Sequence, residues 1–288
     1  HHRGAVMAII VLTSVGASPG VTTTALGLAL QWPRECLLVD ADPHPCRAVE
    51  SGYLGGQVAV GSGLSRMAAV QRSGADMASV LWQHVIALPK PDGGEGPRTN
   101  FLPGYSHLGQ AQLMETMWPS IVDALRDLDQ AEIDVIVDVG RTGTARPPQS
   151  LMAAASVVAV VTRSQLRSLV PLALHGELIG EINAEGTARR GLLVIGPGQP
   201  YGPREITKQF HLPVLATLAD DPRTAACLLD APSPRRWRRS SLATSLSRVA
   251  HILAEQARQH RATAGPAPHS VAIQQPSMVH RHGELEVC

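Results

Sequence analysis

The sequence predicts an α/β protein with a doubly wound, mostly parallel sheet flanked by helices. Short runs rich in Val, Ile and Leu recur along the 288 residues, and longer stretches with helical periodicity separate them. The runs are almost continuously apolar, as in parallel strands that helices cover on both faces. Seven runs are expected strands: 8–14, 36–40, 84–88, 133–139, 157–162, 192–196 and 213–219. Their alternation with helical stretches favours βαβ units.

Four helices are expected, over residues 22–31, 110–128, 165–182 and 242–261. The last one gathers its apolar residues, among them Leu246 and Leu253, on one face that suits docking on a sheet better than insertion into a membrane. The stretch PKPDGGEGPRTN at 89–100 is expected to be a loop.

The composition suggests one globular domain. We expect residues 1–6 to be a disordered or non-native leader, residues 7–261 a single domain, and residues 262–288 a disordered tail rich in Pro, His, Gln and Ser. No apolar run approaches the ~18 residues of a membrane-spanning helix, and no secretory signal is recognisable, so the sequence predicts a cytoplasmic protein.

Charge and cysteine content exclude several classes of function. The net charge is +1 and charged residues make up 17%, so no global field directs the chain to nucleic acid or membranes. Cys36, Cys46, Cys227 and Cys288 lie far apart and form no CxxC pair of the kind that zinc or redox sites use. We therefore expect free thiols.

The loop between the first strand and the first helix has the form of an anion-binding turn. Small residues from Gly16 to Gly20 lead into Thr22, Thr23 and Thr24, which would point backbone N–H groups of a helix N-terminus at a phosphate. The usual motif is GxxxxGK[ST], but Val21 stands where the lysine is expected.

Two other interpretations of this loop were weighed. A dinucleotide fingerprint needs GxGxxG, and the spacing of the glycines does not match it, although Asp40 lies 20 residues beyond Gly20. A plain strand–helix turn would favour the same Gly, Pro and Thr residues.

Two carboxylate-bearing strand ends accompany the loop. LLVDADP at 37–43 ends in Asp40 and Asp42, and VIVDVG at 135–140 contains Asp138. Open α/β sheets bind ligands at the carboxyl ends of their strands. We therefore expect the loop and the three carboxylates to converge on one site suited to a phosphate and hydrated Mg²⁺.

Taken together, GASPGVTT at 16–23, LLVDADP and VIVDVG resemble the ParA/MinD branch of the deviant P-loop ATPases (SIMIBI class), which includes the CpaE/TadZ pilus-assembly localisers. The resemblance covers residues 7 to about 255 and implies ATP and Mg²⁺ as cofactors and a homodimer. By this resemblance Asp40 is the catalytic residue near the attacking water. The nucleotide-binding residues would be Gly16, Ala17, Ser18, Gly20, Val21, Thr22 and Thr23, and the metal-binding residues Thr22, Asp42 and Asp138.

The chain differs from this family mainly in lacking the two lysines of the loop. Gly16 stands in place of the signature lysine and Val21 in place of the phosphate-binding lysine, Pro19 lacks an N–H, and Gly196 replaces an adenine-reading asparagine of many relatives. Losing one charge-assisted contact of ~1.5–3 kcal/mol weakens binding roughly ten- to a hundredfold. A stabilising cation at the transferred phosphoryl is worth about 10³–10⁵ in rate, so hydrolysis suffers more than binding.

These departures define the functional hypotheses. The first is a positioning scaffold with a degenerate Walker A loop and impaired or absent hydrolysis, for pilus or secretion assembly or for chromosome partitioning. The second is a working ATPase in which an arginine replaces the lysine; Arg141 and Arg163 were considered, with a structural or surface role favoured for both. The third is a small-molecule-binding α/β domain.

Partner surfaces are expected in two places. PRRWRR at 234–239 would contact DNA or an anionic membrane, and so place the protein at the nucleoid or the membrane periphery, through Arg235, Arg236, Trp237, Arg238 and Arg239. The alternative is a solvated connector whose tryptophan packs on the body. From their position alone, between Asp42 and Asp138 in the sequence, residues 62–70 and 101–106 are expected to form a partner or dimer surface.

Overall fold

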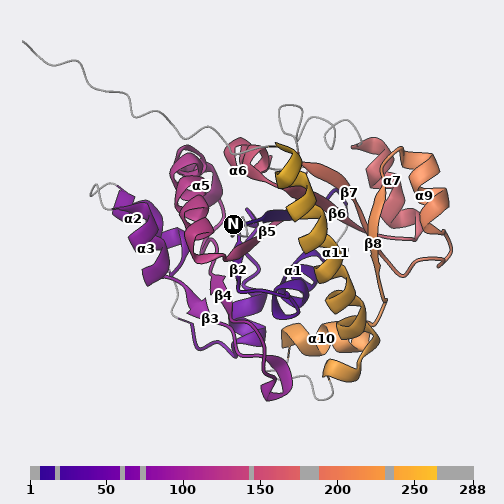
Figure 1. Cartoon of the computed structure of the whole chain (residues 1–288), viewed down its shortest axis with the longest axis horizontal. Coiled ribbons are helices and arrows are strands. Elements are labelled where there is room, and N and C mark those ends of the chain that lie inside the picture. The colour runs from indigo at the N-terminus through magenta and orange to yellow at the C-terminus, as the bar shows by residue number, and fades with distance from the viewer. Residues whose placement is uncertain are drawn as a thin grey trace, which may run out of the picture.

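The computed structural model describes residues 7–16, 20–58, 62–71, 76–142, 146–175, 188–230 and 237–264. Figure 1 shows a central sheet with helices on both faces. The strands are β1 (Ile9–Ser14), β2 (Cys36–Asp40), β3 (Ile86–Ala87), β4 (Thr99–Leu102), β5 (Asp134–Arg141), β6 (Val157–Arg163), β7 (Arg189–Ile195) and β8 (Val214–Leu218). Their order across the sheet is β3-β4-β2-β5-β1-β6-β7-β8, and only β3 is antiparallel to its neighbour. The predicted doubly wound, mostly parallel sheet is confirmed.

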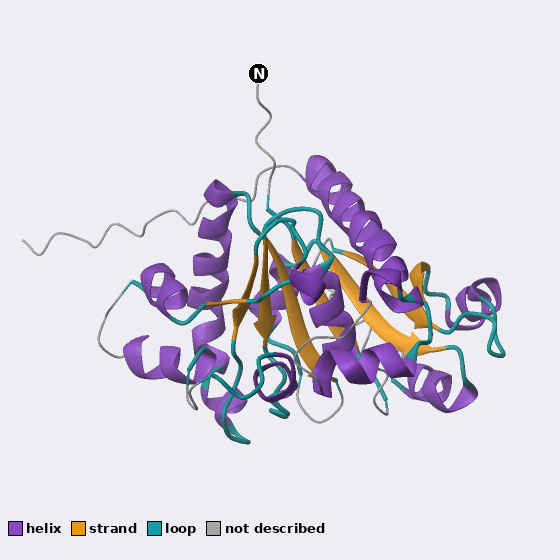
Figure 2. Ribbon diagram, turned by 90° about the horizontal axis from the view of Figure 1, so that it is seen from below, coloured by secondary structure: helices purple, strands orange, loops and turns teal. Residues whose placement is uncertain are grey.

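Helices cover both faces of the sheet (Figure 2). They are α1 (Val21–Leu30), α2 (Leu64–Gln71), α3 (Met77–Gln83), α4 (Gln110–Leu113), α5 (Trp118–Arg126), α6 (Gln149–Ala154), α7 (Leu166–Leu174), α9 (Pro203–Phe210), α10 (Pro222–Asp230) and α11 (Ser241–Ala264). A π-helical turn, Val49–Tyr53, follows β2, and short 3₁₀ turns lie at Pro91–Gly93, Glu115–Met117, Asp127–Ala131 and Trp237–Arg239.

The core is divided by the sheet into two layers. Alternate residues of β1 face opposite sides: Ile10 and Leu12 pack with α1 and α11, whereas Ile9 and Val11 pack with α2, α3, α5 and α6. This explains the unbroken apolar runs in the sequence, because neither side of a central strand meets solvent. A smaller cluster under α7 and α9 extends the core beside β7.

The final helix is a core element, as the sequence predicts. Leu242, Leu246, Val249, Leu253 and Ala257 are all buried against α1 and the sheet. Gly27 of α1 makes the approach possible, because a Cβ there would lie 2.5 Å from a methyl carbon of Leu246. The helix ends at Ala264, three residues beyond the expected end. No helix in the described part of the chain is both long and apolar enough to cross a membrane.

Several local predictions were wrong. Residues 99 and 100 belong to β4 rather than to a loop, and the run at 84–88 contributes only the two-residue edge strand β3. The expected helix over 110–128 is divided, since Pro119 lies in the first turn of α5 and cannot donate a helical hydrogen bond from inside a longer helix. Helix α7 ends at Leu174, and residues 176–187 lie outside the described ranges.

Candidate functional site

The three strand ends singled out in the sequence are neighbours in space. Strand β5 lies between β2 and β1, and Asp40 is in register with Asp138. The backbone N–H of Ala41 donates to the carbonyl oxygen of Asp138 at 2.7 Å, and Thr142 N–H donates to the carbonyl oxygen of Ser14 at 2.7 Å. The loop after β1 and the carboxylates after β2 and β5 therefore share one edge of the sheet.

The helix that follows the loop begins at a glycine. Gly20 precedes α1 with φ 89°, a left-handed conformation that disfavours other residues, and its carbonyl accepts the N–H of Thr24 at 3.0 Å. No side chain caps the helix, so the N–H groups of its first turn, at Val21, Thr22 and Thr23, are directed at the loop. Ala17, Ser18 and Pro19 lie outside the described residues.

Positions 16 and 21, where the sequence lacks the two expected lysines, are both packed against other parts of the fold. Val21 is 7% exposed and belongs to the core cluster shared by α1 and α11. At Gly16, a Cβ would lie 2.6 Å from Cγ of Pro171, so α7 fills the space that a side chain would need. A lysine at position 16 would have to displace α7, which the sequence pattern gave no means of seeing.

Asp138 is a buried carboxylate with incomplete hydrogen bonding. Its side chain is 2% exposed, Oδ1 accepts the N–H of Gly140 at 2.8 Å, and Oδ2 has no hydrogen-bond partner among the described residues. Burial raises its pKa to about 6, with a further increase from Asp42, although the Thr22 hydroxyl and the Gly140 N–H oppose the shift. The Thr22 hydroxyl therefore lies close to the Asp138 carboxylate, whose Oδ2 can accept a donor or a cation.

The other carboxylates reinforce this negative charge. Burial, followed by the charge of Asp138, raises the pKa of Asp40 well above its usual value, and Glu50 and Asp42 add to the increase. Glu50 comes from the π-helical turn, is 3% exposed, and has one carboxylate oxygen without a described partner. Sequence reasoning missed Glu50, because it follows no strand end and no motif surrounds it.

Two glycines allow the carboxylates to approach the sheet edge. Gly140 has φ 62°, and a Cβ there would lie 2.2 Å from Cγ of Asp42. At Gly104, a Cβ would lie 2.8 Å from Cγ of Asp40. Asp42 is further fixed by the N–H of His44, which donates to its Oδ1 at 2.8 Å. Both glycines lie in segments singled out from the sequence, 135–140 and 101–106, but only the tertiary contacts reveal what they do.

The segments 62–70 and 101–106 pack on each other. Leu64 N–H donates to the carbonyl oxygen of Pro103 at 2.8 Å, and Phe101 and Tyr105 are 0% and 3% exposed. The expectation that these segments form a partner surface is therefore wrong for the residues that the structure describes there. Their apolar side chains complete the core beneath the carboxylates instead.

A small cavity adjoins the start of α1. It has a volume of about 50 Å³ and is bordered by Gly20, Thr23, Arg163 and Asp220. Arg163 Nη1 lies 2.8 Å from Asp220 Oδ1 in an ion pair. Gly196, at φ 65°, lies beside Asp220. Arg163 is thus engaged with a carboxylate rather than directed at the loop.

Arg141 differs from Arg163 in this respect. It ends β5, is exposed, and pairs in register with Ser14 next to the loop. No ion pair joins it to a described residue. Within the described ranges, no three His, Cys, Asp or Glu side chains are arranged to hold a metal ion. An ion here would need phosphate oxygens and water as further ligands, which is the common arrangement for Mg²⁺.

The basic segment before α11 is only partly an exposed surface. Trp237 is 1% exposed and packs in the α1–α11 core, which confirms the alternative that the tryptophan packs on the body and rules out its direct contact with a partner. Arg238 and Arg239 are exposed, whereas Arg235 and Arg236 lie outside the described residues. Cys36, Cys46 and Cys227 are free thiols, as expected; Cys288 is not described.

Comparison with solved structures identifies the fold. A ParA family ATPase from Chlorobium tepidum superposes with a TM-score of 0.67 at 15% identity, covering 85% of this chain and 98% of the other. MinD of Pyrococcus horikoshii, a septum site-determining protein in complex with Mg-ADP, gives 0.64 at 18% identity, with 88% and 99% covered. The MinC:MinD complex of Aquifex aeolicus gives 0.65 at 13% identity, with 92% and 98% covered.

Sequence comparison adds nothing to this: no protein-family model matches the chain, and no curated protein matches it. The fold is that of the ParA/MinD P-loop ATPases, and the likeness at this level of identity concerns the fold alone.

Proposed function

We propose that this protein is a nucleotide-responsive positioning protein of the ParA/MinD type, which binds ATP with Mg²⁺ weakly and hydrolyses it very slowly or not at all. One observation carries the proposal. The sheet edge retains the helix N-terminus, Thr22 and the three aspartates, while Val21 and Gly16 occupy both lysine positions and are held there by packing.

The residues present fit a magnesium nucleotide in part. The phosphates would lie against the N–H groups at the start of α1, and the magnesium would be held by the Thr22 hydroxyl with Asp138 and Asp42 behind it. The unpartnered Oδ2 of Asp138 supports this role, because a buried acceptor without a donor is costly unless something occupies it. When bound, the magnesium would neutralise phosphate charge.

Asp40 is proposed as the group that orients an attacking water. It lies in register with Asp138 and its carboxylate is fixed by the Asp42 N–H, which donates to Oδ1 at 3.1 Å. Burial and the charge of Asp138 raise its pKa, so the carboxylate binds a proton more strongly than that of an ordinary aspartate. What the site lacks is a cation beside the transferred phosphoryl, and this supports slow turnover.

A homodimer is proposed through the exposed face of α7. Leu166, Val170 and Leu174 recur every four residues, so they share one face of the helix, and they are 60%, 44% and 74% exposed. The same helix contacts Gly16 through Pro171. Replacing Leu174 by Glu should lower the dimer fraction in light scattering with added ATP, whereas Leu113→Glu, on exposed α4, is the matched control.

The biological role follows only from the fold neighbours and remains a proposal. By their names the neighbours include a cell division ATPase, MinD, and a plasmid partition protein. A role in pilus or secretion assembly or in chromosome partitioning is consistent with a scaffold that binds nucleotide without rapid hydrolysis. Contact with DNA or an anionic membrane through Arg235, Arg236 and Arg239, and hence a location at the nucleoid or membrane periphery, stays a prediction.

Nucleotide titration tests the central proposal. ATP affinity and phosphate release are measured on the wild-type protein and on Asp138→Asn, which should abolish the Mg²⁺ dependence of binding. Wild-type turnover like that of an ordinary ATPase, abolished by Asp40→Ala, would falsify the proposed loss of hydrolysis.

The second candidate is a working ATPase in which Arg141 replaces the lysine. Its exposed position beside Ser14, at the end of β5, is the observation that favours it. In that case Arg141→Gln should abolish phosphate release, and Arg189→Gln, an exposed arginine at the start of β7, should leave it unchanged.

A further inference from the structure

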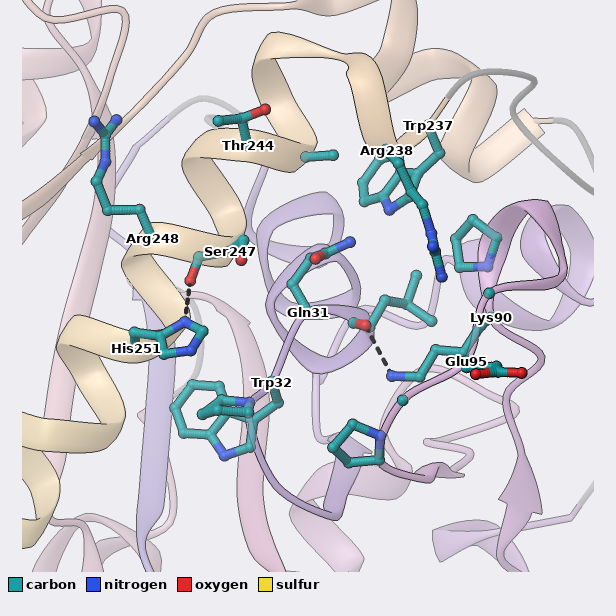
Figure 3. A pocket seen from close by; sticks show the side chains of 17 residues that line it. Gln31, Trp32, Lys90, Glu95, Trp237, Arg238, Thr244, Ser247, Arg248 and His251 are labelled. Carbon is teal, nitrogen blue, oxygen red and sulfur yellow. Dashed lines mark hydrogen bonds between the residues drawn. The ribbon is translucent and has the colours of Figure 1, made fainter.

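A large cavity opens at the edge of the sheet opposite the aspartates. Its volume is about 700 Å³, and its walls come from the end of α1, the 90–97 loop, the turn at Trp237 and the first half of α11 (Figure 3). The residues Leu30 to Pro33 in its wall precede the first residue of β2, whereas Asp40 ends that strand. The cavity is therefore separate from the candidate nucleotide site.

Cations predominate in this cavity. Lys90, Arg238, Arg248 and His251 line it, against a single acidic side chain, that of the exposed Glu95. Arg238 and Arg248 are exposed, and neither forms a hydrogen bond or an ion pair with any described residue. The cavity thus holds positive charge that the described part of the chain does not neutralise.

Lys90 is fixed in place by neutral hydrogen-bond acceptors. Its Nζ donates to the carbonyl oxygen of Leu30 and to the hydroxyl of Thr99, both at 2.8 Å. Both acceptors are neutral, and the first is a carbonyl at the end of α1, where a cation is favourable. The ammonium group is therefore a fixed positive charge in the wall rather than half of an ion pair.

Arg238 is positioned by a close approach to the backbone. A Cβ at Gly94 would lie 2.1 Å from Nη2 of Arg238, so the missing side chain lets the guanidinium lie against the 90–97 loop. Figure 3 shows Arg238 extending from the Trp237 turn toward the loop that carries Lys90 and Glu95. Arg238 and Lys90 thus occupy the same side of the cavity.

The opposite side offers neutral polar groups. Thr244 and Ser247 of α11 face the cavity, Gln31 lies between the two sides, and His251 Nδ1 is 2.8 Å from the carbonyl oxygen of Ser247. That bond makes Nδ1 the protonated nitrogen when the ring is neutral, leaving Nε2 as an acceptor for a ligand hydroxyl. In Figure 3 the side chain of Arg248 extends from α11 away from Lys90 and Arg238.

We propose that this cavity binds a small organic phosphate, with the phosphate on Arg238 and Lys90 and the organic part against α11. Arginine binds phosphate oxygens through paired N–H groups, and a nearby lysine adds a point charge. The volume is that of a site for a small molecule, within the range of about 300–1,000 Å³ for such pockets. The walls are concave, so a small ligand fits them better than the flat backbone of a duplex.

The chain offers an unusually clean chemical test, because Lys90 and Lys208 are the only lysines in the sequence. Pyridoxal 5′-phosphate carries both a phosphate and an aldehyde. Its aldehyde condenses with a neutral amine, releasing water, and borohydride reduces the imine to a stable secondary amine that peptide mass spectrometry locates. Burial lowers the pKa of Lys90, which increases its neutral fraction. Lys208, exposed on α9, is the internal control.

The expected result is labelling of Lys90 at least about tenfold faster than Lys208, the gain expected from one charge-assisted phosphate contact. Arg238→Gln should remove this advantage while Lys208 is labelled as before. Arg239→Gln removes the same charge from the neighbouring exposed residue, which does not line the cavity, and should change nothing. Adenosine monophosphate or inorganic phosphate should protect Lys90, and melting curves check that each variant is folded.

Three outcomes would overturn the proposal. Lys90 labelled no faster than Lys208 would mean that no phosphate is held beside it. Equal loss of labelling in Arg238→Gln and Arg239→Gln would indicate a diffuse basic surface. Protection by short duplex DNA but not by adenosine monophosphate, at equal phosphate concentration, would assign the arginines to nucleic acid. The test uses no property of the candidate nucleotide site, so it stands or falls independently of the proposed function.

Discussion

Strand β5 carries two buried aspartates, Asp134 at its start and Asp138 four residues further on, and their surroundings are opposite. Asp134, at the start, is completely buried, and its carboxylate accepts the N–H of Ala8 at 2.8 Å, Trp32 Nε1 at 2.7 Å and Arg34 Nη2 at 2.7 Å. Asp138, four residues further along the strand, has one hydrogen-bond donor among the described residues, the N–H of Gly140, and lies beside Asp40 and Asp42. One carboxylate is neutralised within the fold, and the other is left for a ligand.

The comparison separates structural from functional charge. A buried carboxylate is tolerated when donors and a cation surround it, and it destabilises the fold when they do not. The candidate site therefore costs stability that a bound cation would restore. The large cavity, at the edge where β2 begins, has the opposite charge. Its arginines lack partners among the described residues and are available to bind an anion.

The largest expected effect on stability comes from removing the Asp134 carboxylate. Asp134→Ala would leave the Arg34 charge and two N–H donors without their acceptor, and should lower the free energy of unfolding by about 3–5 kcal/mol. Chemical denaturation measures this. Asp123→Ala, which removes an exposed partner of Arg126, should cost less than about 1 kcal/mol. Similar losses for both variants would show that burial of Asp134 carries no special weight.

Removing the charge of Asp138 should instead raise the free energy of unfolding. The pKa of Asp138 is raised to about 6 in the fold from an ordinary value of 3.8, so the native state binds the proton more tightly than the unfolded chain. Its ionisation therefore costs no stability below about pH 4, and the cost develops as the pH rises through 6, reaching up to about 3 kcal/mol.

Asp138→Asn should consequently unfold at higher denaturant concentration than the wild type at pH 7, and the difference should disappear near pH 4. Saturating Mg²⁺ and ATP should reduce the advantage of the variant at pH 7, since only the wild type gains a cation contact. A variant less stable than the wild type at pH 7 would show that Asp138 is compensated like Asp134.

Restoring a cation tests the missing lysine directly. Val21→Lys should tighten ATP binding by about ten- to a hundredfold, equivalent to ~1.5–3 kcal/mol, in a calorimetric titration. Some folding stability should be lost, because Val21 packs in the α1–α11 core. Val21→Met, a larger uncharged residue, is the control for packing. Equal affinities for the two variants would indicate that charge at this position is not what limits binding.

The smallest expected effect on stability comes from a substitution at the large cavity. Gly94 has φ −65°, which alanine adopts readily, so Gly94→Ala should raise folding stability by about 0.4–1 kcal/mol by restricting the unfolded chain. Its Cβ should nevertheless push Arg238 off the loop and slow the labelling of Lys90 by pyridoxal 5′-phosphate. Unchanged labelling in a stabilised Gly94→Ala variant would show that the position of Arg238 does not matter.

Predictions from the sequence succeeded where a local pattern of residues has a single structural consequence. Continuous apolar runs required strands covered on both faces, and carboxylates at strand ends required a common edge, so the sheet and the convergence of Asp40 with Asp138 were predictable. It failed at β4, whose four residues are too short to stand out beside a glycine-rich loop, and at the helix that Pro119 divides.

The sequence by itself determined the mostly parallel, doubly covered sheet, the glycine-led helix after β1 and the absence of lysine from the loop, because these depend on periodicity and residue identity along the chain. Only the tertiary structure decided that Pro171 occupies the space at Gly16, that Trp237 is buried, that Glu50 joins the aspartates, and that Lys90 and Arg238 share a cavity. The reason is physical: each of these depends on contacts between segments far apart in the chain, where close packing determines which side chains meet.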